Sequence, residues 1–180
     1  MGFNILSSGS YLPVNQWSDR EMDRFLKLPS GTCRNKFDVE YRHVASTKET
    51  AVYMAMQAIM QCLGNTHSLS SVDLLIYASG THHQALPYDA SAVLAALDAP
   101  TSLESFDLNS TCLSFLSALN LAQNLFIAKR YQRIIIVTSE LATGITLNRS
   151  FTLKPEVATL FADGAAAFLL EQTENEGLIT

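Results

Sequence analysis

One cysteine stands at the junction between a short strand-like run and a long apolar run. Cys112 follows the run at 103–108 and opens the run at 111–131, which has the composition of a helix. In the first turn of a helix, unpaired backbone N–H groups and the helix dipole favour a reactive thiolate. The same N–H groups could stabilise an oxyanion on an acyl group bonded to the sulfur. The alternative is that Cys112 is a small buried apolar residue, and the local pattern leaves both interpretations open.

The other thiols and the histidines form no recognisable site in the sequence. The three cysteines are far apart and include no CxxC pair: Cys33, Cys62 and Cys112. This spacing is typical of free thiols in a reducing cytoplasm. The histidines are four in number: His43, His67, His82 and His83. None has a metal-ligand spacing with a carboxylate or a thiol, so we expect no metal site and only solvated or structural histidines.

The composition sets the class of protein. A chain of 180 residues suits one domain, and 48% hydrophobic with 16% charged residues indicates a globular protein with a large interior. The net charge of −5 argues against a nucleic-acid partner, which would require clustered Lys and Arg. No apolar run has the length of a membrane span, and the N-terminus lacks the pattern of a secretory signal. We therefore expect a cytoplasmic protein with neither a nucleic acid nor a membrane as partner.

Strand-like and helix-like runs alternate along the chain. Strands are predicted over 3–13, 72–80, 103–108, 133–140 and 160–172, with a further strand starting in 176–180. Helices are predicted over 17–28, 46–64, 88–100 and 111–131, and an irregular basic loop over 29–45. The helix at 111–131 is apolar nearly all round and should be buried. Such alternation predicts βαβ units on a mixed sheet, and ligands then gather at the C-terminal ends of the strands, where Cys112 follows one.

Several short motifs occur in one order along nearly the whole chain: "GSYLP", "YRHVAS", "VDLLIYASGT", "LPYDASAVLAAL", "FDLNSTCLSFLSAL", "IIIVTSE" and "FADGAAAFLLE". Together they resemble the N-terminal half of the β-ketoacyl-acyl-carrier-protein synthase III family, within the thiolase superfamily. The block around Cys112 and the downstream "FADGAAA" are the most specific. Asp107 and Cys112 keep the spacing of the family motif, so the resemblance implies that Cys112 is the acylated nucleophile.

The resemblance implies a fold and a reaction. The fold class is α/β: a thiolase-like half with a mixed five-stranded sheet, a buried central helix and flanking helices. Residues 1–180 would form this N-terminal domain, with the C-terminal half absent. The family loads an acyl group from a thioester onto the cysteine and condenses it with a malonyl thioester. Its catalytic His and Asn come from the second half, so we expect the isolated chain to be inactive in condensation.

The substrate-binding residues are also taken from the resemblance. The family pattern "R-T-G-I-x-x-R" reads "KFDVEYR" here, with Lys36 and Arg42 at its ends and Arg34 just before it. These three could guide the phosphopantetheine of an acyl-coenzyme A or an acyl carrier protein, and the alternative is a solvated basic loop. Thr32 replaces a Trp that stacks on the adenine, and Asp38 replaces the Gly. No permanently bound cofactor is implied.

The family also implies association between chains. Leu86 stands where a Phe often reaches across the dimer to line the partner's acyl pocket, and the alternative is that Leu86 only packs in the interface. The family strand that pairs with its twin across a two-fold axis is matched here to 133–140. The chain is therefore expected to form a homodimer or to pair with a second half.

Two rival functions stay open beside condensation, the first of them motivated by the departures at Thr32 and Asp38. The first is acyl transfer to oxygen or nitrogen without condensation. The second is a non-catalytic half-domain that acts as a structural partner, with Cys112 dispensable. The acyl chain length and the choice between coenzyme A and a carrier protein are not specified by the sequence.

Overall fold

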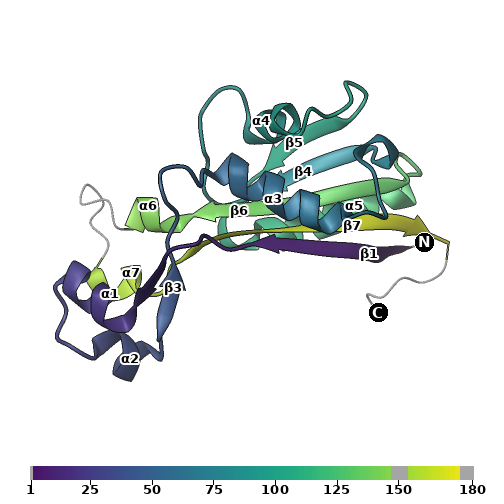
Figure 1. Cartoon of the computed structure of the whole chain (residues 1–180). Helices are drawn as coiled ribbons and strands as arrows, with labels where there is room; N and C mark the ends of the chain where they lie inside the picture. The colour runs from purple at the N-terminus through teal and green to yellow at the C-terminus, as the bar shows by residue number, and fades with distance from the viewer. Residues whose placement is uncertain (1, 147–153, 175–180) are drawn as a thin grey trace.

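The computed structural model describes residues 2–146 and 154–174, and its centre is one mixed five-stranded sheet (Figure 1). The strands lie in the order β1-β7-β6-β4-β5. Their bounds are β1 Gly2–Tyr11, β4 Leu74–Ala78, β5 Glu104–Leu108, β6 Arg133–Leu141 and β7 Asp163–Thr173. β4 runs parallel to β5 and β6, whereas β7 runs antiparallel to β6 and β1. The predicted mixed sheet is confirmed, and the strand predicted at 176–180 lies outside the described residues.

Helices cover both faces of this sheet. α3 (Ala51–Leu63) and α4 (Asp89–Ala96) lie on one face, and α5 (Ser114–Ile127) lies on the other (Figure 1). Successive side chains of a strand point to opposite faces, so β6 supplies Ile135 and Val137 to the core under α3. Its Ile134 and Ile136 enter the core under α5. This alternation explains why the run at 133–140 is apolar at consecutive positions.

The central position of β6 corrects one prediction. β6 pairs with β4 on one side and with β7 on the other, so its backbone N–H and C=O groups have no free edge. The expected pairing of 133–140 with its twin in a second chain is therefore wrong. The edge strands of this sheet are β1 and β5.

The helix that follows Cys112 is buried along one face only. Ala118, Ala122 and Phe126 of α5 are fully buried against the sheet. Leu116 and Ile127 point away from it and are 60% and 53% exposed. The prediction of a helix buried all round is thus met on the sheet side alone.

A small subdomain lies beside one end of the sheet and contains the segment predicted as a loop at 29–45. Its parts are β2 (Gln16–Ser18), α1 (Asp19–Leu26), α2 (Thr32–Phe37) and β3 (Tyr41–His43), with β2 and β3 paired antiparallel. A capping box opens the helix predicted over 17–28: the Ser18 amide donates to Glu21 Oε2 at 2.7 Å, and the Glu21 amide donates to Ser18 Oγ at 3.4 Å.

The loop prediction failed because α2 is capped from outside its own sequence. The carboxylate of Asp23, on α1, accepts hydrogen bonds from the amides of Gly31, Thr32 and Cys33 at 2.6–3.1 Å. These are amides that the first turn of a helix leaves without partners. Asp38 ends α2 with a φ of 53°, which explains why a Gly suits this position in the family pattern.

The remaining elements are short. They are η1 (Leu69–Ser71), η2 (Thr111–Leu113), α6 (Ala142–Thr146) and α7 (Pro155–Ala158). Among the described residues, no helix is both long enough and apolar enough to cross a membrane.

A buried carboxylate ties the end of β1 to the segment before α3. Glu49 accepts hydrogen bonds from the Ser46 amide at 2.8 Å and from the Val14 amide and Tyr11 hydroxyl at 2.9 Å each. These bonds, led by that of the Ser46 amide, lower the pKa of Glu49 from 4.5 to about 2. Burial and the neighbouring carboxylate raise the pKa of Tyr11 to about 12.

We expect Glu49→Gln to lower the free energy of unfolding by about 1–3 kcal/mol at pH 7. Because the folded-state pKa is depressed, the Glu49 contribution is complete above pH 4.5 and is lost as the pH falls toward 2. The difference in the free energy of unfolding between the wild type and the variant should therefore become smaller below pH 4.5. Urea unfolding at a series of pH values measures it, with the exposed Glu174→Gln as control. A gap that stays constant into acid would contradict the role given to Glu49.

Candidate functional site

Cys112 lies beside a cavity of about 520 Å³ at the C-terminal ends of the parallel strands. β5 ends at Leu108, η2 carries Cys112, and α5 begins at Ser114. The predicted succession of strand, turn and helix is present, with the cysteine in a 3-10 turn just before the α-helix. Of the three thiols, Cys112 is exposed and the other two are buried. Burial raises the pKa of Cys33 to about 11 and also raises that of Cys62, so Cys112 is the thiol that solutes can reach.

The turn before the cysteine holds a strained residue. Thr111 has a φ of 53°, a conformation that β-branched residues rarely adopt. The Thr111 amide donates to Asn109 Oδ1 at 2.9 Å. Ser114 Oγ accepts from the Ser110 amide at 2.9 Å and donates to Thr111 O at 2.7 Å. This network of local hydrogen bonds fixes the backbone that presents Cys112.

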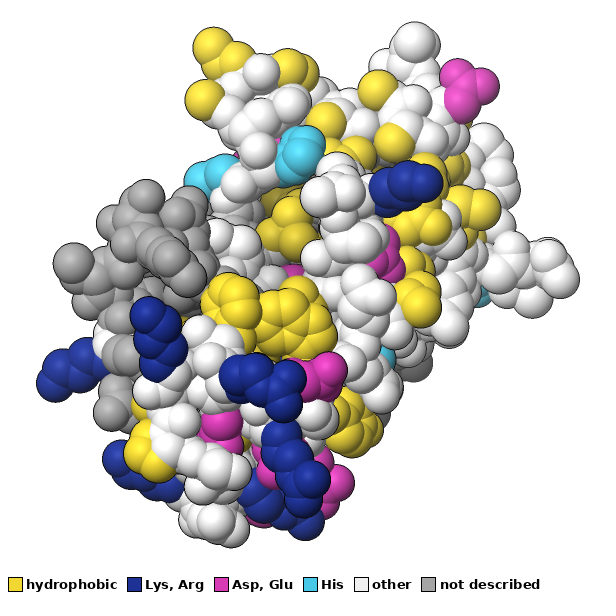
Figure 2. Space-filling view, turned by 60° about the vertical axis from the view of Figure 1, so that its left-hand side comes forward, with side chains coloured by type: hydrophobic (Ala, Val, Ile, Leu, Met, Phe, Trp, Pro, Cys, Tyr) yellow, Lys and Arg dark blue, Asp and Glu magenta, His cyan; other side chains and the backbone are white. Residues whose placement is uncertain are grey.

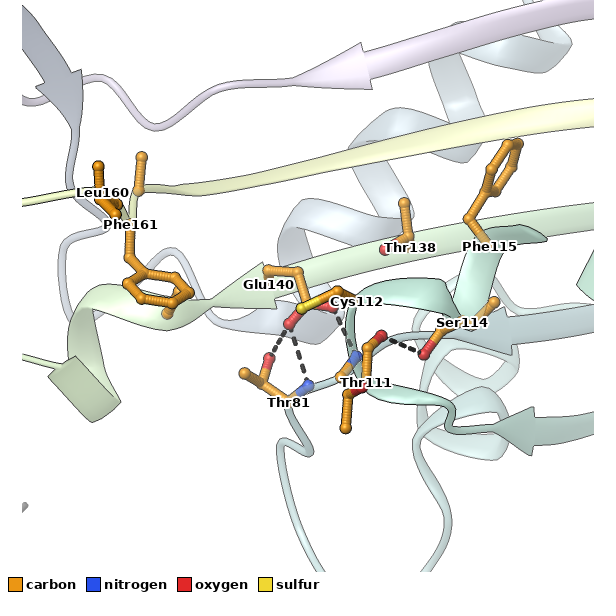
Figure 3. Close-up of a pocket in the computed structure, with 13 residues that line it drawn as sticks. Thr81, Thr111, Cys112, Ser114, Phe115, Thr138, Glu140, Leu160 and Phe161 are labelled. Atoms are coloured by element: carbon orange, nitrogen blue, oxygen red, sulfur yellow. Dashed lines mark hydrogen bonds between the residues drawn. The ribbon is translucent and has the colours of Figure 1, made fainter. Parts of the chain in front are cut away.

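The end of β4 comes close to the same turn because it carries a glycine. A Cβ on Gly80 would lie 3.3 Å from the Thr111 carbonyl oxygen. Glu140, near the end of β6, holds this segment by accepting hydrogen bonds from the Gly80 amide at 2.6 Å, the Thr81 amide at 3.0 Å and Thr81 Oγ1 at 2.6 Å. Figure 3 shows the hydrogen bonds of the Glu140 carboxylate to Thr81 in the cavity that Cys112 also lines. Three neighbouring strand ends are thereby joined around the thiol.

The opposite wall of the cavity comes from the segment between α7 and β7. Leu160, Phe161 and Ala162 line it, and Phe115 of α5 adds a further apolar side chain (Figure 3). Leu160 is 64% exposed and Phe161 is 37% exposed. The cavity therefore has a polar end at Thr81 and Glu140 and an apolar side facing it.

Arg42, predicted to guide a phosphopantetheine, is instead 5% exposed and lies behind this wall. Its Nη1 donates to the carbonyl oxygen of Ala158 at 3.1 Å and to that of Phe161. Burial lowers the pKa of Arg42. The guanidinium holds the cavity wall through its backbone, and direct contact with a substrate stays a prediction.

The other predicted binding residues lie away from the cysteine. Arg34 forms an ion pair with Glu40 and lines a separate hollow on the small subdomain. Lys36 lies over the Phe37 ring, 5.5 Å from its centroid. In Figure 2, Lys and Arg side chains gather over the lower part of the face, below a hollow that holds hydrophobic side chains. Neither Arg34 nor Lys36 lines the Cys112 cavity, so their contact with a substrate also stays a prediction.

Leu86 lies in the segment between β4 and α4 and is 87% exposed. It does not line the Cys112 cavity of this chain. Its proposed part in a partner's pocket is untested and stays a prediction.

The histidines lie outside the Cys112 cavity, and two of them have side-chain partners that the structure defines. Among the described residues that line the cavity there is no histidine. His43 is held between Pro13 O, 2.5 Å from Nδ1, and the Gln16 side chain, 3.2 Å from Nε2. His82, in contrast, comes together with Asp89 and Asp107, and one ligand atom from each lies within 4.8 Å of the others. Sequence spacing missed this group because its members come from a loop, a helix and a strand.

Asp107, which the family motif links to Cys112, forms its hydrogen bonds with the start of α4. Its carboxylate accepts hydrogen bonds from the amides of Asp89 at 2.8 Å and Ala90 at 2.7 Å, which cap the N-terminus of α4. The fixed spacing between Asp107 and Cys112 thus joins a helix cap to the cysteine turn. The sequence analysis did not single out three residues near the thiol: Glu140, Gly80 and Thr111. The sequence does carry a sign of the first two, because a carboxylate ends one predicted strand and a Gly-Thr pair ends another.

The sheet order and the cysteine turn define a thiolase-like half, and comparisons with known proteins place it more closely. Residues 106–180 match the family model of 3-oxoacyl-[acyl-carrier-protein (ACP)] synthase III. The chain is 26% identical over 186 residues to the β-ketoacyl-[acyl-carrier-protein] synthase III of Psychromonas ingrahamii, covering all of the chain and 55% of that protein. It is 27% identical over 183 residues to that of Rickettsia felis, covering 99% of the chain and 56% of the relative.

Solved structures agree in fold. The 3-oxoacyl-[acyl-carrier-protein] synthase III of Aquifex aeolicus superimposes with a TM-score of 0.84 at 26% identity, over 97% of this chain and 55% of that one. The priming β-ketosynthase of the R1128 polyketide pathway superimposes with a TM-score of 0.85 at 22% identity, over 97% and 51%. The predicted thiolase-like fold and the resemblance to the N-terminal half of the synthase III family are confirmed. The chain spans about half the length of the curated relatives it matches.

Proposed function

We propose that this chain supplies the nucleophilic half of a synthase III-like acyltransferase. The observation that carries the proposal is the exposed Cys112 thiol in a strained turn that opens onto a cavity. The Cys112 sulfur attacks the carbonyl carbon of an acyl thioester, and the carbon–sulfur bond to the donor breaks. The donor leaves as a thiol and takes up the proton that Cys112 loses.

The cavity suits the two ends of such a substrate. Its apolar side, with Phe115, Leu160 and Phe161, offers a surface on which an acyl chain could lie. The Leu113 and Ser114 amides donate to Ser110 O and Thr111 O within the turn, so the Cys112 amide would be the backbone donor for the oxyanion that forms on the acyl carbonyl. The donor would be the phosphopantetheine thioester of coenzyme A or of an acyl carrier protein, and the proposal needs no permanently bound cofactor.

The second step of the proposal is condensation with a malonyl thioester. In the family, this step depends on a His and an Asn from the other half, and none of the described cavity residues is a histidine. The 180-residue chain alone is therefore proposed to accept an acyl group without condensing it.

The proposal also includes association with another chain. β5 is an edge strand that follows α4 and precedes the cysteine turn. An edge strand presents unpaired backbone groups to a second strand. We therefore place a homodimer contact at β5 (Glu104–Leu108) in place of the interior strand β6.

Acylation can be tested on this chain by intact mass spectrometry after incubation with acetyl-coenzyme A. We expect one acetyl adduct, which peptide mapping assigns to Cys112, with Cys33 and Cys62 in the same sample as buried internal controls. Cys112→Ala should lose the adduct completely and keep its thermal stability.

The contrary outcome is also clear. If iodoacetamide alkylates Cys112 readily but no acyl adduct forms with any thioester donor, the thiol is accessible but not catalytic. The structural-partner alternative would then hold. In a longer protein that contains both halves, a ketoacyl product would support condensation, and transfer to an added alcohol or amine would support the non-condensing alternative.

A further inference from the structure

A group of potential metal ligands lies next to the cysteine turn but outside the cavity. His82 comes from the segment after β4, Asp89 is the first residue of α4, and Asp107 lies on the edge strand β5. One ligand atom from each lies within 4.8 Å of the other two. A shallow hollow lined by His82, Gln84, Ala85, Tyr88 and Asp107 gives this group access to solvent.

Asp89 is the unusual member of the group because its carboxylate is fully buried. Its Oδ2 accepts from the His83 amide at 2.9 Å and lies 3.6 Å from His82 Nδ1. Its Oδ1 has no hydrogen-bond partner among the described residues. A buried carboxylate oxygen without a partner loses its hydration and gains nothing in return.

The charges around Asp89 make this cost larger. The Asp107 carboxylate lies in the same group, so two negative charges are close together. The α4 amides that bind Asp107 compensate for part of this charge. The ion pair that the structure gives Asp89 is with His82, and it requires a protonated ring.

The geometry points to a binding site for a divalent transition-metal ion such as Zn²⁺, held by His82 Nδ1 and the carboxylates of Asp89 and Asp107. Imidazole nitrogen and carboxylate oxygen are the donors that Zn²⁺ takes from proteins, and water from the hollow would complete its coordination. The ion would neutralise the charge of both carboxylates. It would also place a positive charge near Asp89 Oδ1, which has no hydrogen-bond partner among the described residues.

The ring of His82 is already oriented for such a ligand. His82 Nε2 lies 3.0 Å from the side-chain amide of Asn109, which in turn donates to Gly80 O at 3.3 Å, and Nδ1 faces Asp89.

The consequence for the fold is local. The segment 82–88 joins Thr81, at the Cys112 cavity, to the start of α4, and it carries the exposed Leu86. A metal ion on His82, Asp89 and Asp107 would fix both ends of this segment against β5. The ion is thus assigned a structural role beside the cavity and takes no part in acylation.

Zinc binding tests this assignment independently of any acyl chemistry. The protein is prepared as Cys112→Ala, to remove the accessible thiol, stripped with a chelator and titrated with zinc chloride by calorimetry. We expect one equivalent of zinc. His82→Ala should lower the affinity about tenfold or more, and the neighbouring His83→Ala, whose side chain lies outside the group, should leave it unchanged.

Two further measurements guard against a trivial result. Asp89→Asn, once circular dichroism shows that it is folded, should also lose the zinc. Amide hydrogen exchange in 82–88 should slow on adding zinc to the parent and not to His82→Ala. Equal zinc affinity in the His82 and His83 variants would show adventitious surface binding, and no binding by the parent would likewise overturn the assignment.

Discussion

Replacing Gly9 by Ala is expected to lower the free energy of unfolding by about 3 kcal/mol or more. Gly9 lies on β1 where the strand passes directly against α3. An added Cβ would lie 2.3 Å from the carbonyl oxygen of Ala58 and 2.4 Å from the amide nitrogen of Cys62. Both atoms belong to the helix backbone, so no side-chain rotation can relieve the clash. The strand or the helix must move as a whole.

Urea unfolding of Gly9→Ala measures this effect, and Ser8→Ala on the same strand is the matched control. Ser8 is exposed, so its substitution should change the stability by no more than about 0.5 kcal/mol. If the two variants unfold at the same urea concentration, α3 does not lie as close to β1 as described. A structure-wide loss of amide protection in Gly9→Ala alone would support the close packing.

The sequence predicted well what depends on local pattern. The runs at 72–80 and 133–140 are apolar at consecutive positions, and they form β4 and β6, which are buried on both faces. The junction at Cys112 was recognised because a strand-like run meets a helix-like run there. Gly64 ends α3 as predicted, since a glycine after the last periodic residue is a frequent helix stop.

What the sequence did not predict depends on contacts between distant residues. Asp23 of α1 caps α2, which was predicted as a loop because its own sequence carries no cap. The helix predicted over 88–100 is present as α4, but its cap by Asp107 of β5 was not predicted. Glu140 reaches Gly80 and Thr81 across 59 or 60 positions in the chain. The pattern of 133–140 already favours an interior strand, because a strand with two apolar faces generally has neighbours on both sides and no free edge to pair with a twin.

Replacing Arg42 by Met is the change that separates the two roles considered for this residue. Met has a similar length but no hydrogen-bond donor. The carbonyl oxygens of Ala158 and Phe161 would therefore lose the hydrogen bonds that the Arg42 guanidinium donates to them. Hydrogen bonds to a charged group each contribute about 1.5–3 kcal/mol, so we expect a loss of about 3 kcal/mol in the free energy of unfolding. Amide exchange in 158–162 should also accelerate, because Arg42 holds that wall.

The matched control is Arg34→Met, which removes a solvent-exposed ion pair with Glu40 and should cost less than about 1 kcal/mol. If Arg42 holds the cavity wall, its variant should lose stability and amide protection in 158–162. If Arg42 instead binds the donor directly, its variant should keep its stability and lose affinity for acetyl-coenzyme A. The buried guanidinium and its two carbonyl partners favour the first result, since a side chain that is 5% exposed must break those bonds before it can reach a phosphate.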